Sequence, residues 1–185
     1  MLCAPLALHA VDTRAEETLK VEATRYGDTV QVNARALVKA PIAIIWSTLT
    51  DYDHLPDFIP GLEKSRLVER HGNRATIEQS GYAHLWLFRF PLHATVEVTE
   101  KPPTSIRTRL LHGNLKRLEG TYDIKKIADS ETYLLHWSGT IEPEANIPTF
   151  LAAPLMRKNI AEQFQGMIKE IERRANLPPL PTPPP

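Results

Sequence analysis

Between residues 29 and 141, hydrophobic and polar positions alternate along the chain with the two-residue period of half-buried β-strands. The segments that show this alternation are 29–38, 62–70, 74–88, 92–99, 106–112, 115–127 and 132–141. Several are joined by short stretches rich in glycine, asparagine, aspartate or proline, which favour tight turns. Because short turns join antiparallel neighbours, the pattern predicts one antiparallel sheet of about seven strands.

Helical periodicity appears on either side of these strands. Pro41 precedes a short amphipathic segment at 42–49, and a second short helix is expected before the chain is broken by Pro56 and Pro60. After Pro148 the spacing predicts a long helix, whose apolar face consists of Met156, Ile160, Phe164, Met167 and Ile171. Only this helix is long enough to cover the sheet. The sequence therefore predicts an α+β fold in which a strongly curved sheet surrounds the C-terminal helix and leaves space for a ligand.

The two ends of the chain differ from this central region. Residues 1–27 form a lead-in whose apolar start resembles the remnant of a secretory signal, and whose charged part from 11 to 27 is expected to be irregular or loosely helical. This pattern favours an exported or periplasmic protein over a cytoplasmic one with a frayed terminus. Residues 28–176 are expected to form one domain, and the proline-rich residues 177–185 an extended tail. Cys3 is the single cysteine, so a disulfide within the chain is excluded.

The charge of the chain is balanced, with 22 Lys and Arg residues against 22 Asp and Glu residues. This balance predicts no steering toward nucleic acid or toward an anionic membrane surface. No hydrophobic run is long enough to cross a bilayer. Four basic residues, Arg107, Arg109, Lys116 and Arg117, could form a patch that docks a protein partner. A solvated outer sheet face is the better interpretation of them.

Two motifs make the chain similar to a known family. The first spans residues 46–61 and consists of Trp46, Leu49, Asp51, Tyr52, Pro56, Phe58, Pro60 and Gly61; the second spans residues 113–122. With the order of the elements, they resemble the START-like superfamily, and within it the bacterial polyketide cyclase/dehydrase and coenzyme-Q-binding START group. The resemblance covers residues 29–175. It implies a helix-grip fold that holds an apolar small molecule beneath the C-terminal helix, without implying catalysis.

Strand parity predicts which side chains line that cavity. If Ile77 points inward, then every second residue on its strand does so too, and Leu118 and Leu135 set the parity of two further strands. The expected pocket residues are Phe58, Ile59, Ile77, Gln79, Gly81, Leu118, Gly120, Tyr122, Trp137, Met156, Ile160 and Phe164, with Phe58 and Ile59 near the mouth. The inward glycines, which include Gly139, are explained equally well by sheet curvature and by room for a ligand.

The polar members of this set, Gln79 and Tyr122, each need a hydrogen-bond partner if they are buried. They could bind a quinone or another carbonyl oxygen. A bond to each other or to trapped water is the more favoured interpretation. Trp137 is favoured as a core residue over a stacking platform for a ligand.

The sequence predicts no catalytic residue, metal site or cofactor. His84, His93, His112 and His136 fall on outward positions, and so do Glu119 and Asp123. The histidines show no metal-ligand spacing, and no serine has the Gly-x-Ser-x-Gly setting of a hydrolase nucleophile. Asp51 and Asp53 are interpreted as caps of the second short helix.

These observations predict a protein that carries or sequesters a hydrophobic small molecule: a lipid, an isoprenoid quinone or a polyketide-like compound. The alternative is a polyketide cyclase or dehydratase that uses the same pocket. An ionisable group inside the cavity, such as His84, His136 or Glu119, would favour the enzyme. Replacement of Gly120 by leucine is expected to block ligand uptake while the fold stays largely intact, which ligand-binding and thermal-melting measurements would check.

Overall fold

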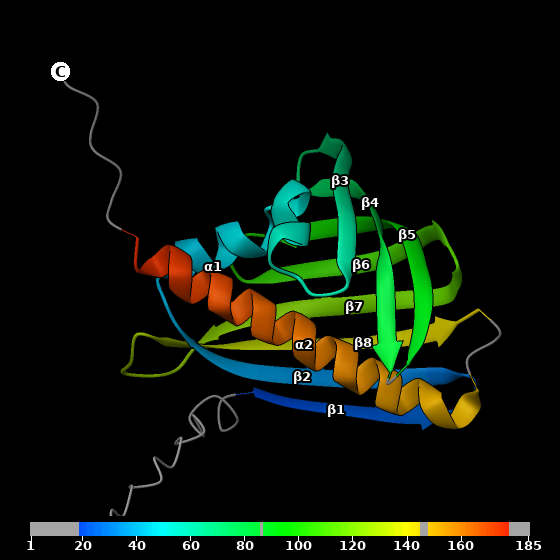
Figure 1. Ribbon diagram of the computed structural model, residues 1–185. Helices are drawn as coiled ribbons and strands as arrows, with labels where there is room; N and C mark the ends of the chain where they lie inside the picture. Colours follow the sequence, from blue (N-terminus) through cyan, green and yellow to red (C-terminus); the bar gives the residue numbers. More distant parts are fainter. Residues whose placement is uncertain (1–18, 86, 145–147, 178–185) are drawn as a thin grey trace, which may run out of the picture.

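The computed structural model describes residues 19–85, 87–144 and 148–177 of the chain. Its elements, in chain order, are β1 (Leu19–Tyr26), β2 (Thr29–Lys39), α1 (Ile42–Leu49), η1 (Tyr52–Asp57), β3 (Leu62–His71), β4 (Arg74–Leu85), β5 (Phe88–Lys101), β6 (Ser105–Gly113), β7 (Leu115–Lys126), β8 (Thr132–Pro143) and α2 (Thr149–Ala175). All strands belong to one antiparallel sheet with the order β1-β2-β8-β7-β6-β5-β4-β3. The sheet curves around α2, which crosses it diagonally (Figure 1). This arrangement confirms the predicted α+β helix-grip fold.

One strand was missed by the sequence pattern. Part of the lead-in that was expected to be irregular or loosely helical forms β1, which pairs along its whole length with β2. Leu19, Val21 and Ala23 alternate with charged or polar residues and pack against the core. So short an alternation is hard to recognise among charged residues. The segment is a strand because it pairs with β2, and the local pattern does not show that pairing. Residues 1–18, which contain the signal-like stretch, and 178–185, most of the proline-rich tail, lie outside the described residues.

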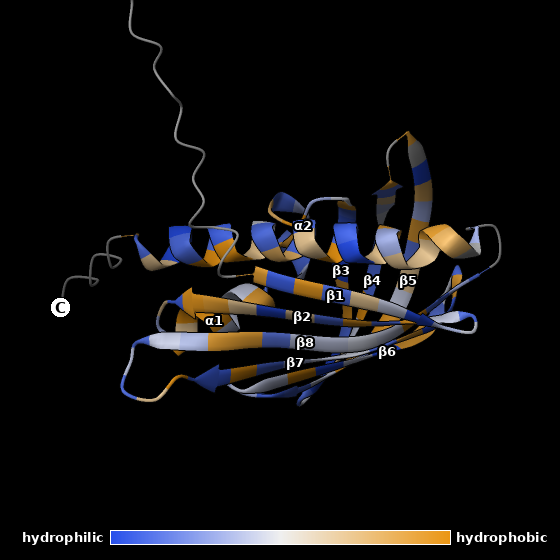
Figure 2. Cartoon of the chain, turned by 90° about the horizontal axis from the view of Figure 1, so that it is seen from below, coloured by the Kyte–Doolittle hydropathy of each residue, from blue (hydrophilic) through white to orange (hydrophobic). Residues whose placement is uncertain are grey.

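The core lies between one face of the sheet and one face of α2. On β2, the inward residues Val30, Val32, Ala34, Ala36 and Val38 are almost completely buried, while the residues between them are exposed or half-buried. Helix α2 contributes buried side chains that include Leu155, Phe164, Met167 and Ile171. It contacts β1, β2, β4 and α1. Figure 2 shows α2 lying over the sheet, with hydrophobic and hydrophilic positions interleaved along the strands.

The broken stretch between η1 and β3 passes between α2 and the sheet at very close range. A Cβ atom at Gly166 of α2 would collide with the carbonyl oxygen of Phe58, and one at Gly81 of β4 would collide with that of Gly61. Gly61 itself has a φ of +82°, which favours glycine, and its carbonyl accepts a hydrogen bond from the Tyr82 amide at 2.7 Å. Glycines at these positions therefore allow the stretch to lie between helix and strand.

A buried polar network fixes the start of η1. The Tyr52 hydroxyl donates a hydrogen bond to Glu100 at 2.7 Å, and Arg70 donates two more to the same carboxylate at 3.0 and 3.1 Å. Both Tyr52 and Glu100 are buried. Burial and the neighbouring Glu100 carboxylate raise the pKa of Tyr52, so the phenol stays protonated and acts as a donor.

The two aspartates of this region do not cap η1 through their side chains, contrary to the prediction. Asp53 accepts a hydrogen bond from the Leu67 amide of β3 at 2.7 Å, and Asp51, at the N-cap position, makes no capping bond. Because η1 folds back against β3, Asp53 lies within reach of that strand. Both side chains join η1 to other elements.

Replacement of Tyr52 by phenylalanine is expected to lower the free energy of unfolding by about 1–3 kcal/mol, because a buried carboxylate loses one of its hydrogen bonds. Urea-induced unfolding measures this change. The matched control is Tyr26→Phe, at a tyrosine that is 58% exposed, where a change within about 0.5 kcal/mol is expected. Equal effects of the two substitutions would contradict a stabilising role of the network.

Candidate functional site

An apolar cavity of about 230 Å³ lies beneath the N-terminal half of α2. We call it the outer chamber. Its walls come from the strands β3 to β8 and from α2, and they include Leu92, Leu115, Leu118, Ile141, Met156 and Ile160. Because these side chains belong to both the sheet and the helix, the chamber exists only where the two layers meet.

A second cavity, of about 180 Å³, lies beneath the C-terminal half of α2, next to α1 and η1. We call it the inner chamber. Its apolar lining includes Leu49, Ile59, Ile77, Val98, Ile106 and Met167. Part of this chamber's wall therefore comes from η1, from the start of β3 and from the stretch between them, through Leu55, Leu62 and Ile59, respectively.

The two chambers share five lining residues: Leu62, Gln79, Thr108, Tyr122 and Gln163. Four of these are polar, and we call Gln79, Thr108, Tyr122 and Gln163 the polar girdle. They come from β4, β6, β7 and α2, respectively. The chambers are thus neighbours, and their junction is the place where polar side chains from four elements meet.

Tyr122 is the most constrained member of the girdle. Its ring stacks on Phe164 at a centroid distance of 5.9 Å and contacts Trp137 at 6.3 Å. Among the described residues, its hydroxyl has no hydrogen-bond partner. Burial raises the pKa of Tyr122, so the phenol is a hydrogen-bond donor and not a phenolate. Because Tyr122 lines both chambers, its hydroxyl is available there to a ligand or to water.

The girdle contains two amide side chains, and their hydrogen bonding differs. The Gln79 amide donates to the Ser65 hydroxyl at 3.3 Å, and no bond between Gln79 and Tyr122 is found among the described residues, while the expected bonds to trapped water stay a prediction. Within residues 19–85, 87–144 and 148–177, no hydrogen-bond partner of the Gln163 side chain is found. Gln163 and Tyr122 are therefore both free to bind a molecule at the junction.

The structure brings most of the predicted pocket residues together. Those that line the outer chamber are Gln79, Gly81, Leu118, Gly120, Tyr122, Trp137, Met156 and Ile160, and those that line the inner chamber are Ile59, Ile77, Gln79 and Tyr122. Phe164 lies behind Tyr122 in the core and lines neither chamber. Phe58, expected near the mouth, lies in a groove outside α2 beside Gly166, with the Arg174 guanidinium 5.4 Å from its ring. Phe58 points outward because it lies in the turn between η1 and β3. Strand parity applies only within a strand, so it could not predict the direction of this side chain.

The inward glycines make room for a side chain of the protein itself. Gly120 and Gly139 are cross-strand partners, and the Trp137 indole covers both: a Cβ atom at either position would lie 2.6–2.8 Å from that ring. Since Trp137 is buried, a leucine at 120 would displace it from the core as well as filling the cavity. The expectation that Gly120→Leu leaves the fold largely intact is therefore revised, and that substitution does not test the cavity cleanly.

Asn159 and Gln163 were not singled out from the sequence. The Asn159 carbonyl oxygen accepts a hydrogen bond from the His84 amide at 2.9 Å, and its NH₂ donates to the His84 carbonyl at 3.0 Å. Pairing of β4 with β3 ends at Gly81, so Asn159 takes the place of a strand neighbour beyond that point. The available signal was the presence of two amides, four residues apart, beside the apolar stripe of α2.

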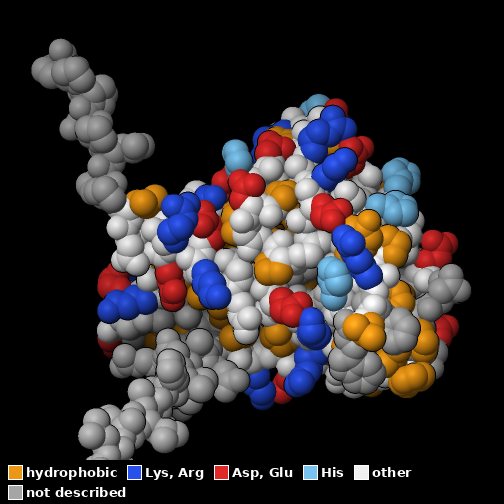
Figure 3. All heavy atoms as spheres, in the orientation of Figure 1, with side chains coloured by type: hydrophobic (Ala, Val, Ile, Leu, Met, Phe, Trp, Pro, Cys, Tyr) orange, Lys and Arg blue, Asp and Glu red, His pale blue; other side chains and the backbone are white. Residues whose placement is uncertain are grey.

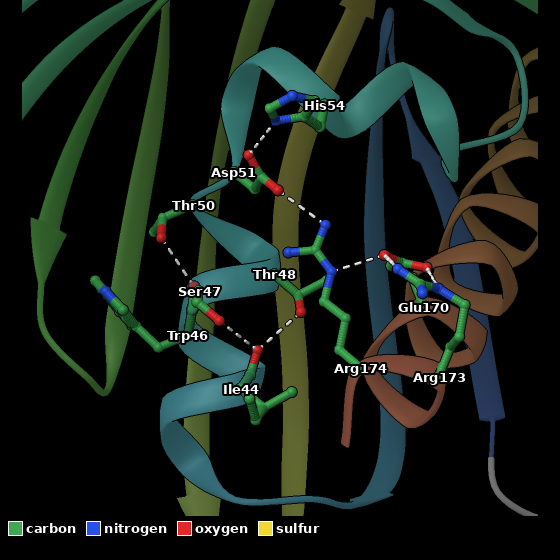
Figure 4. Close-up of polar contacts among 10 residues, drawn as sticks. All are labelled: Ile44, Trp46, Ser47, Thr48, Thr50, Asp51, His54, Glu170, Arg173 and Arg174. Atoms are coloured by element: carbon green, nitrogen blue, oxygen red, sulfur yellow. Dashed lines mark hydrogen bonds and ion pairs between the residues drawn. The ribbon is translucent and has the colours of Figure 1, made fainter. Parts of the chain in front are cut away.

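A second polar cluster holds the other end of α2 against the junction of α1 and η1 (Figure 4). Arg174 donates to Asp51 at 2.8 Å and to Glu170 at 2.6 Å, and Arg173 donates to Glu170 twice at 2.7 Å. His54 lies 2.7 Å from Asp51. Hydrogen bonds from Arg173 and Arg174 lower the pKa of Glu170 to about 2, against the opposite effect of burial. We call these residues the Asp51–Arg174 clamp.

The charged residues considered as candidates for chemistry lie outside the chambers. Neither lining contains an Asp, Glu, His, Lys or Arg residue among those described. His93, His112 and Glu119 are exposed, and His84 and Asp123 are half-buried. His136 was predicted to be solvated, but it is half-buried and its Nε2 atom is fully buried. Burial, together with Arg35 on the adjacent strand, lowers the pKa of His136.

Three of the four basic residues considered as a docking patch are paired with acidic ones. Arg109 lies 3.0 Å from Glu97, Arg117 lies 2.9 Å from Glu119, and Lys116 lies 3.8 Å from Glu142. This pairing supports the interpretation as a solvated sheet face. On the opposite face, Figure 3 shows mixed charges and a gathering of hydrophobic side chains where α2 begins. The described residues at that end include Leu87, which is 99% exposed, and Phe150, which is 75% exposed.

Two further features concern the described part of the chain. No three His, Cys, Asp or Glu side chains gather closely enough there to hold a metal ion. None of the helices found there combines the length and the hydrophobicity that a membrane crossing requires.

A curved antiparallel sheet, one long C-terminal helix across it and an apolar cavity between them define a helix-grip protein. Residues 29–176 match the family described as "Polyketide cyclase / dehydrase and lipid transport". The chain belongs to this family. No curated protein sequence matches it significantly.

Solved structures share the fold at low sequence identity. A STAR-related lipid transfer protein from Xanthomonas axonopodis is 13% identical, with a TM-score of 0.70 over 88% of this chain and 97% of that one. The Zhui aromatase/cyclase from a Streptomyces species is 17% identical, with a TM-score of 0.68 over 79% and 95% of the two chains. A START superfamily protein from Mycobacterium smegmatis is 17% identical, with a TM-score of 0.61 over 78% and 96%. These similarities show the fold.

The Asp51–Arg174 clamp predicts an acid-sensitive contribution to stability. The pKa of Glu170 is about 2 in the folded protein against an ordinary value of 4.5, so its contribution is complete above pH 4.5 and is lost as the pH falls toward 2. Glu170→Gln removes this titration and is expected to flatten the dependence of the unfolding free energy on pH in that window. Urea unfolding at several pH values measures it. Parallel curves for variant and wild type would contradict the role of the clamp.

Proposed function

We propose that the protein binds a hydrophobic small molecule with at least one oxygen function, and that it carries or sequesters this molecule. The observation that carries the proposal is the pair of apolar chambers whose junction holds polar groups without a hydrogen-bond partner among the described residues, which include the Tyr122 hydroxyl and the Gln163 amide. Apolar walls supply affinity, at about 25 cal/mol for each Å² removed from water before the costs of ordering. The polar groups supply orientation.

The ligand classes that fit this description are lipids, isoprenoid quinones and polyketide-like compounds. A quinone is the first to test, because its carbonyl oxygens can accept hydrogen bonds from Tyr122 and Gln163 while its tail contacts only hydrocarbon. The family's description includes lipid transport, and one structure with this fold is titled a lipid transfer protein. Both agree with carriage of an apolar molecule.

The alternative function is that of a polyketide cyclase or dehydratase. It is supported by the family's description and by the aromatase/cyclase with the same fold. A cyclase or dehydratase needs groups that move protons. Tyr122 can donate a hydrogen bond, but its raised pKa makes it a poor base, and the charged candidates His84, His136 and Glu119 do not line either chamber. Binding is therefore the function that the geometry supports best.

Native mass spectrometry of the protein purified from its source tests the proposal directly. We expect a bound apolar molecule that contains oxygen, which solvent extraction releases for identification. Protein that is free of ligand from its source, and that takes up no short-tailed quinone on titration, would contradict the proposal.

Tyr122→Phe tests the part of the phenol. We expect about tenfold weaker binding of a short-tailed quinone, the equivalent of one hydrogen bond of about 1.4 kcal/mol, with an unchanged or slightly raised melting temperature. Isothermal titration calorimetry and thermal melting measure the two effects. Tyr26→Phe, at an exposed tyrosine, is the control. Unchanged quinone affinity in Tyr122→Phe would show that the ligand does not use this hydroxyl.

A further inference from the structure

We infer that the inner chamber is a separate subsite that takes the hydrocarbon tail of an elongated ligand, while the polar girdle holds an oxygen function near the middle of that ligand. This inference rests on the proposed function and specifies the shape of the molecule. The occupant of the inner chamber is a flexible aliphatic or isoprenoid segment. The occupant of the outer chamber is the rest of the molecule.

The size of the chambers supports an elongated shape. Drug-sized ligands occupy pockets of about 300–1,000 Å³. The outer chamber, at about 230 Å³, and the inner chamber, at about 180 Å³, each fall below this range, whereas the two together reach it. A compact, multi-ring molecule of that size would exceed either chamber, but a chain that passes the girdle can fill both.

The apolar lining of the inner chamber favours a hydrocarbon segment of the ligand. Apart from the girdle, its only polar lining residue among those described is Tyr52, whose hydroxyl already donates to Glu100 at 2.7 Å. A ligand oxygen beyond the girdle would therefore be buried without a partner, which is unfavourable. A hydrocarbon segment has no such cost, and it would contact side chains such as Ile59, Ile77 and Val98.

The girdle is placed to recognise an oxygen at the junction. Tyr122 is held between Phe164 and Trp137, so its hydroxyl is positioned before any ligand arrives. Gln163 adds an amide from the opposite layer, on α2. A carbonyl oxygen at this point can accept hydrogen bonds from both layers, whereas an oxygen at the end of a long tail would lie away from them.

Isoleucine residues allow the two chambers to be observed separately. Ile59, Ile77 and Ile106 line the inner chamber, whereas Ile141 and Ile160 line the outer one. The probe is dihexyl ketone, whose single oxygen lies between two hexyl arms. With isoleucine methyl groups labelled, we expect nuclear Overhauser effects from the probe to both sets of methyl groups. Contacts with Ile141 and Ile160 alone would overturn the tail subsite and leave the proposed function standing. Contacts with neither set would count against both.

Val98→Phe supplies the matched variant, because Val98 lines only the inner chamber. We expect about tenfold weaker binding of dihexyl ketone, with binding of diethyl ketone, which fits the outer chamber alone, unchanged within about twofold. Ala94→Leu, which fills the outer chamber, is expected to weaken both probes. Val98→Leu replaces Val98→Phe if the larger ring prevents folding. Equal affinity of wild type and the Val98 variant for dihexyl ketone would overturn the inference.

Discussion

In the described part of the chain, a single long helix has to cover the apolar face of an eight-stranded sheet. Helix α2 does so by crossing the sheet diagonally, and polar contacts hold it at two places. Asn159 binds the open edge of β4 at His84, and Arg174 binds Asp51 where α1 meets η1. Between these contacts the curved sheet and the helix do not meet everywhere, and the two chambers occupy the space that remains.

Glycine positions decide how closely the layers approach. Gly166 and Gly81 allow the stretch after η1 to pass between α2 and β4, so that Ile59 and Leu62 reach the inner chamber. Gly120 and Gly139 lie beneath the Trp137 indole, which in turn supports Tyr122. The absence of side chains at these four positions therefore shapes the cavity walls as much as the apolar residues do.

The distribution of polar groups connects this architecture to function. Arg109 pairs with Glu97 on the outer face, Arg174 pairs with Asp51 at the C-terminal end of α2, and the buried Glu100 is paired with Arg70. Among the described residues, no charged side chain lines either chamber, and four of the polar ones lie at the junction of the two. An apolar site with a few fixed hydrogen-bonding groups suits selective binding of an oxygen-containing hydrocarbon, and it provides little for proton transfer.

Local periodicity was enough to predict seven of the strands, the three helical segments and the inward parity that places Ile77, Gln79 and Tyr122 beside the chambers. These follow from side-chain alternation within a strand or a helix, which needs no knowledge of distant residues. The tertiary structure supplied the features that depend on contacts between distant segments. It added β1, turned Phe58 outward, laid Trp137 over two glycines, and brought Gln163 of α2 to Tyr122 of β7. Their positions are set by how the sheet curves and where α2 crosses it, and neither is encoded within a single segment.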